Sequence, residues 1–495
     1  MKKMRFFSSL RVKIKYIVKI STIMTFKRNF YFIFIKICDI IYSVLLYSTV
    51  LRWLEYFQRL SMRFYDEQIE TASREQIRAI QLQRMKKQIS FTYQNVPHYK
   101  KKMDAAGVHP DDIRKLEDIR YIPFSTKVDM RDNYPYGLFA VPMEKIVRIH
   151  ASSGTTGKPT VVGYTREDLD MWSRCIARLA VAAGASPSDI AQISFGYSLF
   201  TGAFGLHYGL ERLGTTVVPI SSGNTERQIM IMKDFGTTLL VSTPSYALYL
   251  AETAEKLGVS KELKLKIGMF GGEGMTEAMR SEVESRFGIV ATQNYGLSEV
   301  LGPGVSGECV YKCGQHINED YFYPEIIDPV TGEVLPDGAT GELVLTPLEK
   351  TGIPMLRYRT KDITSLVYDK CECGRTTVRH TTIQGRSDDM LIIRGVNVFP
   401  SQIEEVLLKV PEIGPHYEII VRREGYLDTL EILVEPANAS VLENYGTLEG
   451  LQSRIRARLR VTLQLDAAVR LVEPNTLKRF EGKGKYVTDL RNLKN

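Results

Sequence analysis

The sequence predicts an α/β protein whose large domain is built on mostly parallel sheets flanked by helices. Between residues 191 and 270, short apolar runs alternate with stretches of helical periodicity, and alternation at this spacing is typical of strand–helix–strand units in a parallel sheet. Hydrophobic residues make up 44% and charged residues 25% of the 495 residues, which allows a large buried core. A chain of this length favours two to four domains.

The charge balance argues against a basic, nucleic-acid-binding body. The formal net charge is +8, but the first 61 residues alone hold twelve Lys/Arg and two Asp/Glu, a net charge of +10. The remaining residues therefore carry a net charge of −2, without the basic excess typical of nucleic-acid-binding domains. Six cysteines in the whole chain are too few for a secreted disulfide framework.

Residues 1–61 form a basic, aromatic and isoleucine-rich leader that contains neither glycine nor proline. The longest uncharged run, Ile40 to Leu51, has twelve residues, against the roughly 20 that a spanning helix needs. No small-residue cleavage site follows the apolar run, which argues against a signal peptide. Three interpretations stay open: an over-long start with translation beginning at Met62, an amphipathic anchor at a membrane surface, and a membrane span.

After the leader, a packing helix is expected over residues 71–95, where apolar residues recur mainly on one side. Thr71 or Ser73 can cap its start, and the segment around Pro97 ends it. Further predicted elements, in chain order, are helix 111–116, helix 166–183, strand 191–195, strand 216–220, helix 225–235, strand 238–242, helix 246–257, strand 266–270 and strand 342–345.

A loop rich in hydroxyl groups and glycine lies at residues 152–160, between apolar runs that are predicted to be strands. Glycines let backbone N–H groups point inward, hydroxyls add donors, and Lys158 adds a positive charge, so the loop suits a polyphosphate. Pro159 disfavours the helix that follows a Walker loop. A flexible surface hairpin is the structural alternative. The predicted phosphate donors are Ser152, Ser153, Gly154, Thr155, Thr156 and Gly157.

This loop resembles the phosphate loop of the adenylate-forming ligases, which activate a carboxylic acid with ATP. The run Tyr-Pro-Tyr-Gly-Leu-Phe-Ala-Val-Pro at residues 134–142 narrows the resemblance to the phenylacetate–CoA ligases. Several motifs follow in the expected order from about Met62 to the C-terminus. The resemblance implies a large AMP-binding domain at 62–387 and a small, mobile α+β lid domain at 388–495.

The resemblance also implies which residues meet the acid. Aromatic residues around proline and glycine often only pack a corner, but in this family the loop helps to wall the acyl pocket, where an aromatic ring is held between aromatic faces. Tyr136, Phe139 and Gly271 are the pocket candidates, and residues 196–202 are a candidate rim.

The nucleotide motifs follow predicted strands, where open parallel sheets bind their ligands. The family usually has Gly-Ala-Glu-Pro-Trp where this chain has Gly271-Gly-Glu-Gly-Met275, which predicts a looser adenine slot. Glu299, usually a solvated loop residue in such a position, resembles the carboxylate that holds Mg²⁺ against the phosphates. Tyr295 can stack on adenine. The other nucleotide-binding candidates are Gly272, Glu273, Asn294, Gly296, Asp362 for the ribose, and Arg386 for ribose or phosphate.

The C-terminal part of the resemblance concerns domain rotation and catalysis. Asp388 would be the hinge, and Gly395 would let the pantetheine arm of CoA pass. Lys483 matches the catalytic lysine that stabilises charge on the α-phosphate during adenylation. The family has Gly-Lys-Ala where this chain has Gly482-Lys-Gly, so Lys485 is the second candidate. Helix 401–410 and strands 417–421 and 430–434 are expected in this domain.

Two cysteine-containing segments predict a structural metal site. Thiolate and imidazole ligands at short spacings, paired from two segments, suit tetrahedral zinc, and four protein ligands leave no open position for catalysis. Cys309, His316, Cys371 and Cys373 look like the ligand set of metal-bearing members of the family. Cys313 is an alternative ligand, and reduced thiols without metal are the structural alternative.

The sequence therefore predicts a phenylacetate–CoA ligase that uses ATP, CoA and Mg²⁺, carries a structural Zn²⁺, and acts in the cytoplasm in aromatic acid metabolism. A homodimer stays open. Four other hypotheses remain: a ligase for another aryl acid, a ligase that loads a carrier protein, an adenylyltransferase with a non-CoA acceptor, and a non-catalytic nucleotide binder. CoA-dependent release of AMP would indicate a CoA ligase and would argue against the carrier-protein ligase, the adenylyltransferase and the nucleotide binder.

Overall fold

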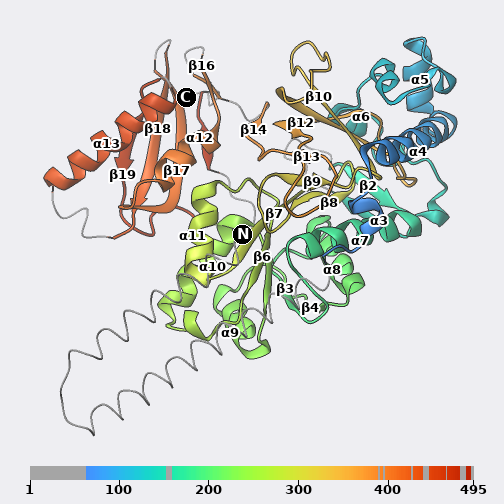
Figure 1. Ribbon diagram of the computed structural model, residues 1–495. Helices are drawn as coiled ribbons and strands as arrows, with labels where there is room; N and C mark the ends of the chain where they lie inside the picture. Colours follow the sequence, from blue (N-terminus) through green and yellow to red (C-terminus); the bar gives the residue numbers. More distant parts are fainter. Residues whose placement is uncertain are drawn as a thin grey trace, which may run out of the picture. The chain divides into compact units, whose positions relative to one another are not determined.

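The computed structural model describes the unit of the chain that begins at Arg63 (Figure 1). The described residues are 63–151, 159–387, 391–393, 396–424, 427–438, 445–463, 465–479 and 486–491. The predictions for the leader, residues 1–61, therefore lie outside them. None of the helices in the described ranges has the length and hydrophobicity that a membrane crossing needs.

The unit begins with four helices: α3 (Glu67–Glu70), α4 (Arg74–Asn95), α5 (Pro97–Ala105) and α6 (Lys127–Asp132). Ser73 caps α4 in a reciprocal pairing with Gln76, a capping box. Helix α4 ends at Asn95, as predicted, and Pro97 occupies the first turn of the next helix, α5, where its missing N–H costs nothing. The helix expected at 111–116 is wrong, because the Asp118 carboxylate binds the N–H groups of residues 114 and 115 between two short 3₁₀ turns.

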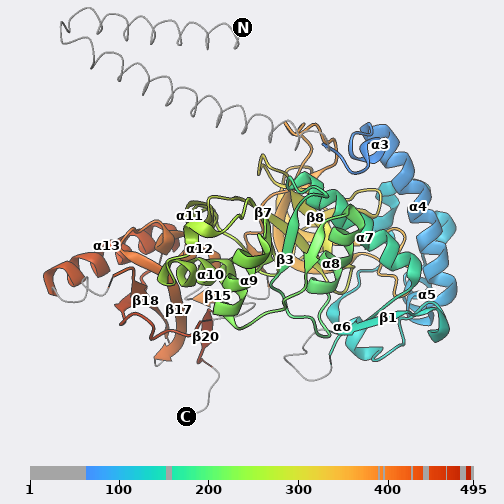
Figure 2. The ribbon, with the colours of Figure 1, turned by 90° about the horizontal axis from the view of Figure 1, so that it is seen from below.

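The predicted parallel sheet is present. Its strands are β3 (Ile190–Ile193), β4 (Thr216–Val218), β5 (Leu239–Ser242), β6 (Ile267–Phe270) and β7 (Val290–Leu297), paired in the order β4-β3-β5-β6-β7. Helices α7 (Arg166–Ala182) and α8 (Gly202–Leu213) cover one face, and α9 (Thr225–Phe235), α10 (Pro244–Lys256) and α11 (Glu277–Phe287) cover the other (Figures 1 and 2). Of these helices, α8 and α11 were not predicted.

The same sheet continues with antiparallel strands, of which the sequence predicted one, at 342–345, within β11 (Thr340–Pro347). They are β8 (Gly302–Glu308), β9 (Gln315–Ile317), β10 (Phe322–Ile327), β11 (Thr340–Pro347), β12 (Tyr358–Val367), β13 (Arg379–His380) and β14 (Gly385–Arg386). With β3 to β7 they make a 12-stranded sheet within the described residues. Its order is β10-β11-β12-β13-β9-β8-β7-β6-β5-β3-β4, with β14 beside β12. The expectation of mostly parallel sheets therefore holds for β3 to β7. The change of direction occurs at β7, because a tight turn joins it to β8 without a crossover helix.

The C-terminal residues form a separate hydrophobic cluster, built on a sheet ordered β19-β18-β17-β20. Helices α12 and α13 pack side by side on one face of this sheet (Figure 2). Valine and isoleucine alternate along the central strands, as expected for strands with one buried face. The elements are the hairpin β15 (Leu391–Ile393) and β16 (Val396–Val398), then α12 (Pro400–Leu408), β17 (Ile413–Glu424), β18 (Leu427–Pro436), α13 (Tyr445–Leu463), β19 (Ala468–Leu471) and β20 (Val487–Asp489).

Candidate active site

The predicted phosphate loop is carried by a hairpin of two strands, β1 (Arg148–Ala151) and β2 (Val161–Tyr164), which pair antiparallel. The prediction of a strand-to-strand turn is thus confirmed. The loop residues at 152–158, including Lys158, lie outside the described residues, and their roles stay predictions. The base of the hairpin is held at both strands. The Ala151 N–H donates to the Leu199 carbonyl at 2.9 Å, and the Tyr164 hydroxyl donates to the Leu301 carbonyl at 2.5 Å.

The ends of β6 and β7 form a narrow backbone surface. A Cβ on Gly271 would lie 2.5 Å from the Asn294 carbonyl oxygen, and Gly272 has a φ of +82°, so glycine is required at both positions. The Asn294 amide donates to the Phe270 carbonyl at 3.0 Å. Gly271 therefore belongs to this strip of backbone, where a side chain would block the approach of a flat base.

Glu273 is held by the start of α10. Its carboxylate accepts hydrogen bonds from the Ser245 N–H, at 2.8 Å, and from the Ser245 hydroxyl. Gly296 has a different constraint, because a Cβ there would meet the Gly302 carbonyl oxygen where β7 turns into β8. Both residues thus shape the loops around the candidate nucleotide site.

Three predicted nucleotide residues come together at the end of the sheet. The Tyr295 hydroxyl donates to Asp362 Oδ2 at 2.5 Å, and Arg386 Nη1 lies 3.2 Å from Asp362 Oδ1. These residues come from β7, β12 and β14, of which β12 and β14 are paired at this position. Burial raises the pKa of Tyr295 well above its ordinary value, so its hydroxyl stays a donor. The arrangement fixes a carboxylate that can accept ribose hydroxyls.

His380, which no sequence motif indicated, supports this group. Its ring meets the Tyr295 ring edge to face, with the centroids 5.2 Å apart. Burial lowers the pKa of His380 to about 4, so the ring is neutral at physiological pH. Its Nδ1–H donates to the Thr381 carbonyl and its Nε2 accepts from the Ser306 hydroxyl, both at 2.7 Å. A neutral histidine with both nitrogens engaged holds the tyrosine ring in place.

Glu299 lies in the turn between β7 and β8 and is 8% exposed. Its carboxylate accepts no hydrogen bond from any residue in the described ranges. A nearly buried carboxylate is normally paired, and carboxylate oxygen is a preferred ligand of Mg²⁺. The residue therefore fits the predicted magnesium role.

The candidate acyl residues Tyr136 and Phe139 lie together, with ring centroids 5.0 Å apart. The Phe139 ring packs directly on β2, since a Cβ on Gly163 would lie 2.6 Å from it. Tyr136 is 46% exposed. Tyr197, in the candidate rim at 196–202, has its hydroxyl 3.0 Å from His207 Nδ1 of α8, and His207 Nε2 lies 3.0 Å from Glu211. The sequence did not indicate these contacts.

Comparison with known proteins gives the family. A model of AMP-binding enzymes matches residues 68–346, and a model of the AMP-binding enzyme C-terminal domain matches residues 395–491. The chain is 50% identical over 442 residues to the phenylacetate-coenzyme A ligase of Thermus thermophilus, covering 86% of this chain and 99% of that one. It is 50% identical over 428 residues to the Escherichia coli phenylacetate-coenzyme A ligase, with coverages of 86% and 97%. The chain belongs to the phenylacetate–CoA ligase family.

Among solved structures, this family member resembles 2-hydroxyisobutyryl-CoA ligase. The TM-score is 0.82 for that enzyme in the postadenylation state with R3-HIB-AMP, at 28% identity, covering 86% of this chain and 92% of that one. It is 0.65 for the same enzyme with 2-HIB-AMP and CoA in the thioesterification state, at 29% identity, with coverages of 87% and 93%. The adenylate-forming ligase fold predicted from the sequence is confirmed.

In this phenylacetate–CoA ligase family member, the predicted metal ligands converge. One ligand atom from each of Cys309, His316, Cys371 and Cys373 lies within 4.8 Å of the others, and all four residues are buried. Hydrogen bonds from the Cys309 and Cys371 thiols lower the pKa of Cys373, which favours a thiolate. Cys313 is exposed, but its Sγ lies 3.2 Å from that of Cys371, so it stays an alternative ligand. The donor set fits tetrahedral zinc.

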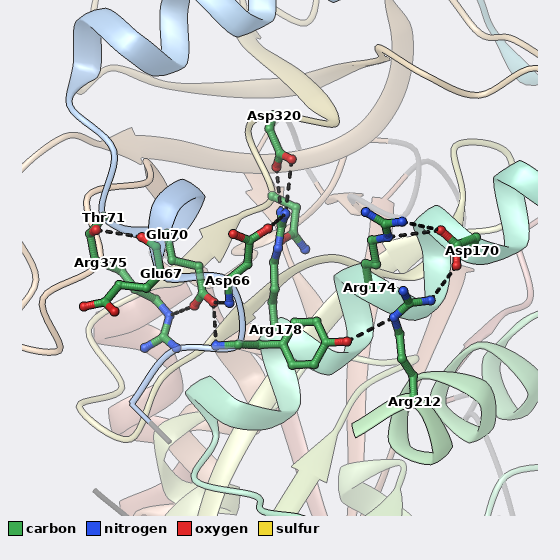
Figure 3. A network of polar contacts seen from close by, with 12 residues as sticks. Asp66, Glu67, Glu70, Thr71, Asp170, Arg174, Arg178, Arg212, Asp320 and Arg375 are labelled. Atoms are coloured by element: carbon green, nitrogen blue, oxygen red, sulfur yellow. Dashed lines mark hydrogen bonds and ion pairs between the residues drawn. The ribbon is translucent and has the colours of Figure 1, made fainter. Parts of the chain in front are cut away.

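The segment 63–72 is bound to the rest of the domain by polar contacts of Asp66 and Glu70 (Figure 3). Arg63 Nε donates to the Cys373 carbonyl at 3.0 Å. Arg375 Nε lies 2.6 Å from Glu70 Oε2, in a pair that is almost fully buried. Asp66 Oδ2 lies 2.7 Å from Arg178 Nη2. The first described residues are therefore part of the fold.

The hinge candidate Asp388, the CoA-channel candidate Gly395 and the lysines Lys483 and Lys485 lie outside the described residues. The chain is described again from Tyr486, whose ring stacks on Tyr417 with centroids 4.8 Å apart. The Tyr417 hydroxyl donates to Glu404 at 2.9 Å. Burial raises the pKa of Glu404 to about 8, so this carboxyl is protonated in the folded ligase at neutral pH.

Proposed function

We propose that this chain is a phenylacetate–CoA ligase that joins phenylacetate to CoA at the expense of ATP, with release of AMP and pyrophosphate. The convergence of Tyr295, Asp362 and Arg386 at the strand ends carries the proposal. It is supported by Glu299, a nearly buried carboxylate close by in sequence that accepts no hydrogen bond within the described part of the chain. Support for the acid comes from the phenylacetate-coenzyme A ligases, which match nearly their full length at about half identity. The structural neighbour that acts on 2-hydroxyisobutyrate is less similar.

In the first half-reaction, the carboxylate of the acid attacks the α-phosphate of ATP, giving acyl-AMP and pyrophosphate. Asp362 would hold the ribose, and the phosphate loop with Lys158 would hold the leaving pyrophosphate. Lys483 would stabilise the charge that develops on the α-phosphate. Bound through Glu299, Mg²⁺ would neutralise phosphate charge. The aromatic pair Tyr136 and Phe139 would hold the phenyl ring.

In the second half-reaction, the CoA thiol attacks the acyl carbon of the acyl-AMP and AMP leaves. The C-terminal domain, from 388 to 495, would rotate about Asp388 so that Lys483 leaves and CoA enters past Gly395. The protein supplies orientation and electrostatics, without a covalent enzyme intermediate. A cytoplasmic enzyme fits these substrates. A homodimer is compatible with the proposal but is not required by it.

The decisive experiment measures pyrophosphate release over a panel of acids, with and without CoA. The panel contains phenylacetate, ring-hydroxylated phenylacetates, benzoate and 2-hydroxyisobutyrate. Phenylacetate-dependent pyrophosphate release with CoA-dependent release of AMP supports the proposal. Preference for another acid would identify that acid as the substrate. Release of AMP with a carrier protein but not with CoA favours the carrier-protein alternative, and the absence of turnover favours a nucleotide binder.

We also propose that the cluster of Cys309, His316, Cys371 and Cys373 holds a structural zinc ion. Metal analysis of the purified chain should find about one zinc per chain. Cys371→Ser should lose the metal and lower the melting temperature, whereas Cys313→Ser should keep both. Zinc-free native protein would contradict the proposal, and loss of zinc from Cys313→Ser would place that residue in the ligand set.

A further inference from the structure

A lysine that no motif selects lies between strand β2 and the turn that carries Glu299. Lys350 follows β11 and is fully buried, at 0% exposure. Its Nζ donates to the Glu299 carbonyl at 3.3 Å, the single hydrogen bond that this ammonium makes within the described residues. It also lies 5.0 Å from the centre of the Tyr164 ring. An ammonium is costly to bury, so its place between these two groups calls for an explanation.

The two groups belong to different parts of the site. Tyr164 is the last residue of β2, the strand that leaves the phosphate loop. Glu299 belongs to the turn after β7 and is the magnesium candidate. The Tyr164 hydroxyl donates to the carbonyl of Leu301, two residues after Glu299, at 2.5 Å. Lys350 and Tyr164 therefore join the phosphate hairpin to the Glu299 turn through two main-chain carbonyls.

The backbone around Lys350 is itself held from three sides. The Lys350 carbonyl accepts from Gln88 of α4 at 2.6 Å. The N–H groups of Thr351 and Gly352 donate to the Asp168 carboxylate of α7 at 2.7 and 2.8 Å. A Cβ on Gly352 would lie 2.6 Å from the Gly163 carbonyl oxygen of β2. The lysine thus projects from a backbone that is fixed to α4, α7 and β2.

We propose that Lys350 is a positioning residue for the ATP half-reaction, which holds the Glu299 turn at a fixed distance from the phosphate hairpin. The ammonium acts through the main chain of Glu299 and leaves the carboxylate available to the metal that accompanies ATP. Burial lowers the pKa of Lys350 to about 8, and the negative charges of Asp168 and Glu299 offset part of this effect. This inference rests on the proposed function, because it assigns Glu299 to the nucleotide side of the reaction.

The test replaces Lys350 with methionine, which keeps most of the apolar chain and removes the donor and the charge. Loss of one charge-assisted hydrogen bond corresponds to roughly tenfold or more in a binding constant. Lys350→Met should therefore raise KM for MgATP at least about tenfold, while thioester formation from supplied phenylacetyl-AMP stays within about twofold. The affinity for Mn²⁺ in the presence of a non-hydrolysable ATP analogue, measured by electron paramagnetic resonance, should fall by a similar factor.

Lys233→Met is the matched control, because this surface lysine pairs only with Glu262 at 2.8 Å among the described residues. It should change none of these readouts. Tyr164→Phe removes the second link without burying a new group, and should show the same division between half-reactions with a smaller effect. It keeps the inference testable if Lys350→Met does not fold.

A folded Lys350→Met chain with unchanged KM for MgATP and unchanged Mn²⁺ affinity would overturn the inference. Equal loss of both half-reactions in folded Lys350→Met and Tyr164→Phe would overturn it too, since it would show a general structural role. If the unchanged protein adenylates no acid, the proposed function fails. The Mn²⁺ measurement then still decides whether Lys350 positions the nucleotide site.

Discussion

Asp362→Asn tests the ribose site most directly, because it keeps the shape of the side chain. In the structure, Oδ2 accepts from the Tyr295 hydroxyl at 2.5 Å and Oδ1 lies 3.2 Å from Arg386. An amide has a single oxygen and turns an NH₂ group toward one of these two donors. The variant therefore loses one acceptor in the free protein and loses the negative charge that would meet the ribose hydroxyls.

The expected size follows from these contacts. A hydrogen bond to a charged group contributes about 1.5–3 kcal/mol, so loss of one such bond to the ribose should raise KM for ATP roughly 10- to 150-fold. The Arg386 pair adds little, because its guanidinium is more than one-third exposed. KM for the acid should change little, because the acid does not touch Asp362 in the proposed arrangement.

The assay is pyrophosphate exchange with ATP concentration varied at saturating phenylacetate, with the melting temperature as a check on folding. Tyr295→Phe is the companion variant. It keeps the carboxylate and removes only the group that orients it, so its effect on KM for ATP should be smaller. A folded Asp362→Asn chain whose KM for ATP stays within twofold of the original would refute the ribose assignment.

Three further predictions follow from other parts of the chain. Glu404, buried against Tyr417 and near Glu273, has a pKa raised from 4.5 to about 8, so the free energy of unfolding should be highest below about pH 4.5 and should fall as pH rises toward 8. Glu404→Gln should remove this fall, which is at most about 5 kcal/mol by linkage. An equally steep pH dependence of unfolding in the variant would contradict the prediction. Removal of residues 1–61 should leave activity and melting temperature unchanged. Removal of residues 1–72 should lower both, because the ion pairs of Asp66 with Arg178 and of Glu70 with Arg375 are lost (Figure 3). Equal behaviour of the two truncated chains would show that these ion pairs do not matter for stability. Lys483→Ala should abolish acyl-AMP formation and spare thioester formation from supplied acyl-AMP, and a normal adenylation rate would move the role to Lys485.

Local pattern was enough for much of this protein. Local sequence placed α7, α9 and α10 within a few residues. Helices α9 and α10 bury mainly one side, which a period of apolar residues reveals, whereas α7 is buried all round in its second half. The apolar runs around a loop of glycine and hydroxyl residues predicted the β1–β2 hairpin, because proline after the lysine disfavours a helix there. The spacing of cysteine and histidine predicted a cluster that the fold brings within 4.8 Å, since ligands for one metal must come from segments that can meet.

Only the tertiary structure decided which distant groups touch. The antiparallel half of the large sheet depends on pairing between β12, β13 and β9. Strands β9 and β13 have three and two residues, too few to show the alternation that marks a strand in a sequence. Lys350 and His380 sit in sequence surroundings that predict nothing about burial, yet one supports the Glu299 turn and the other the Tyr295 ring. Lys350 contacts Glu299, which lies 51 residues earlier in the chain, and His380 contacts Tyr295, which lies 85 residues earlier. A sequence displays the chemistry of each side chain, but burial and partners are properties of packing, which exist only once the chain has folded.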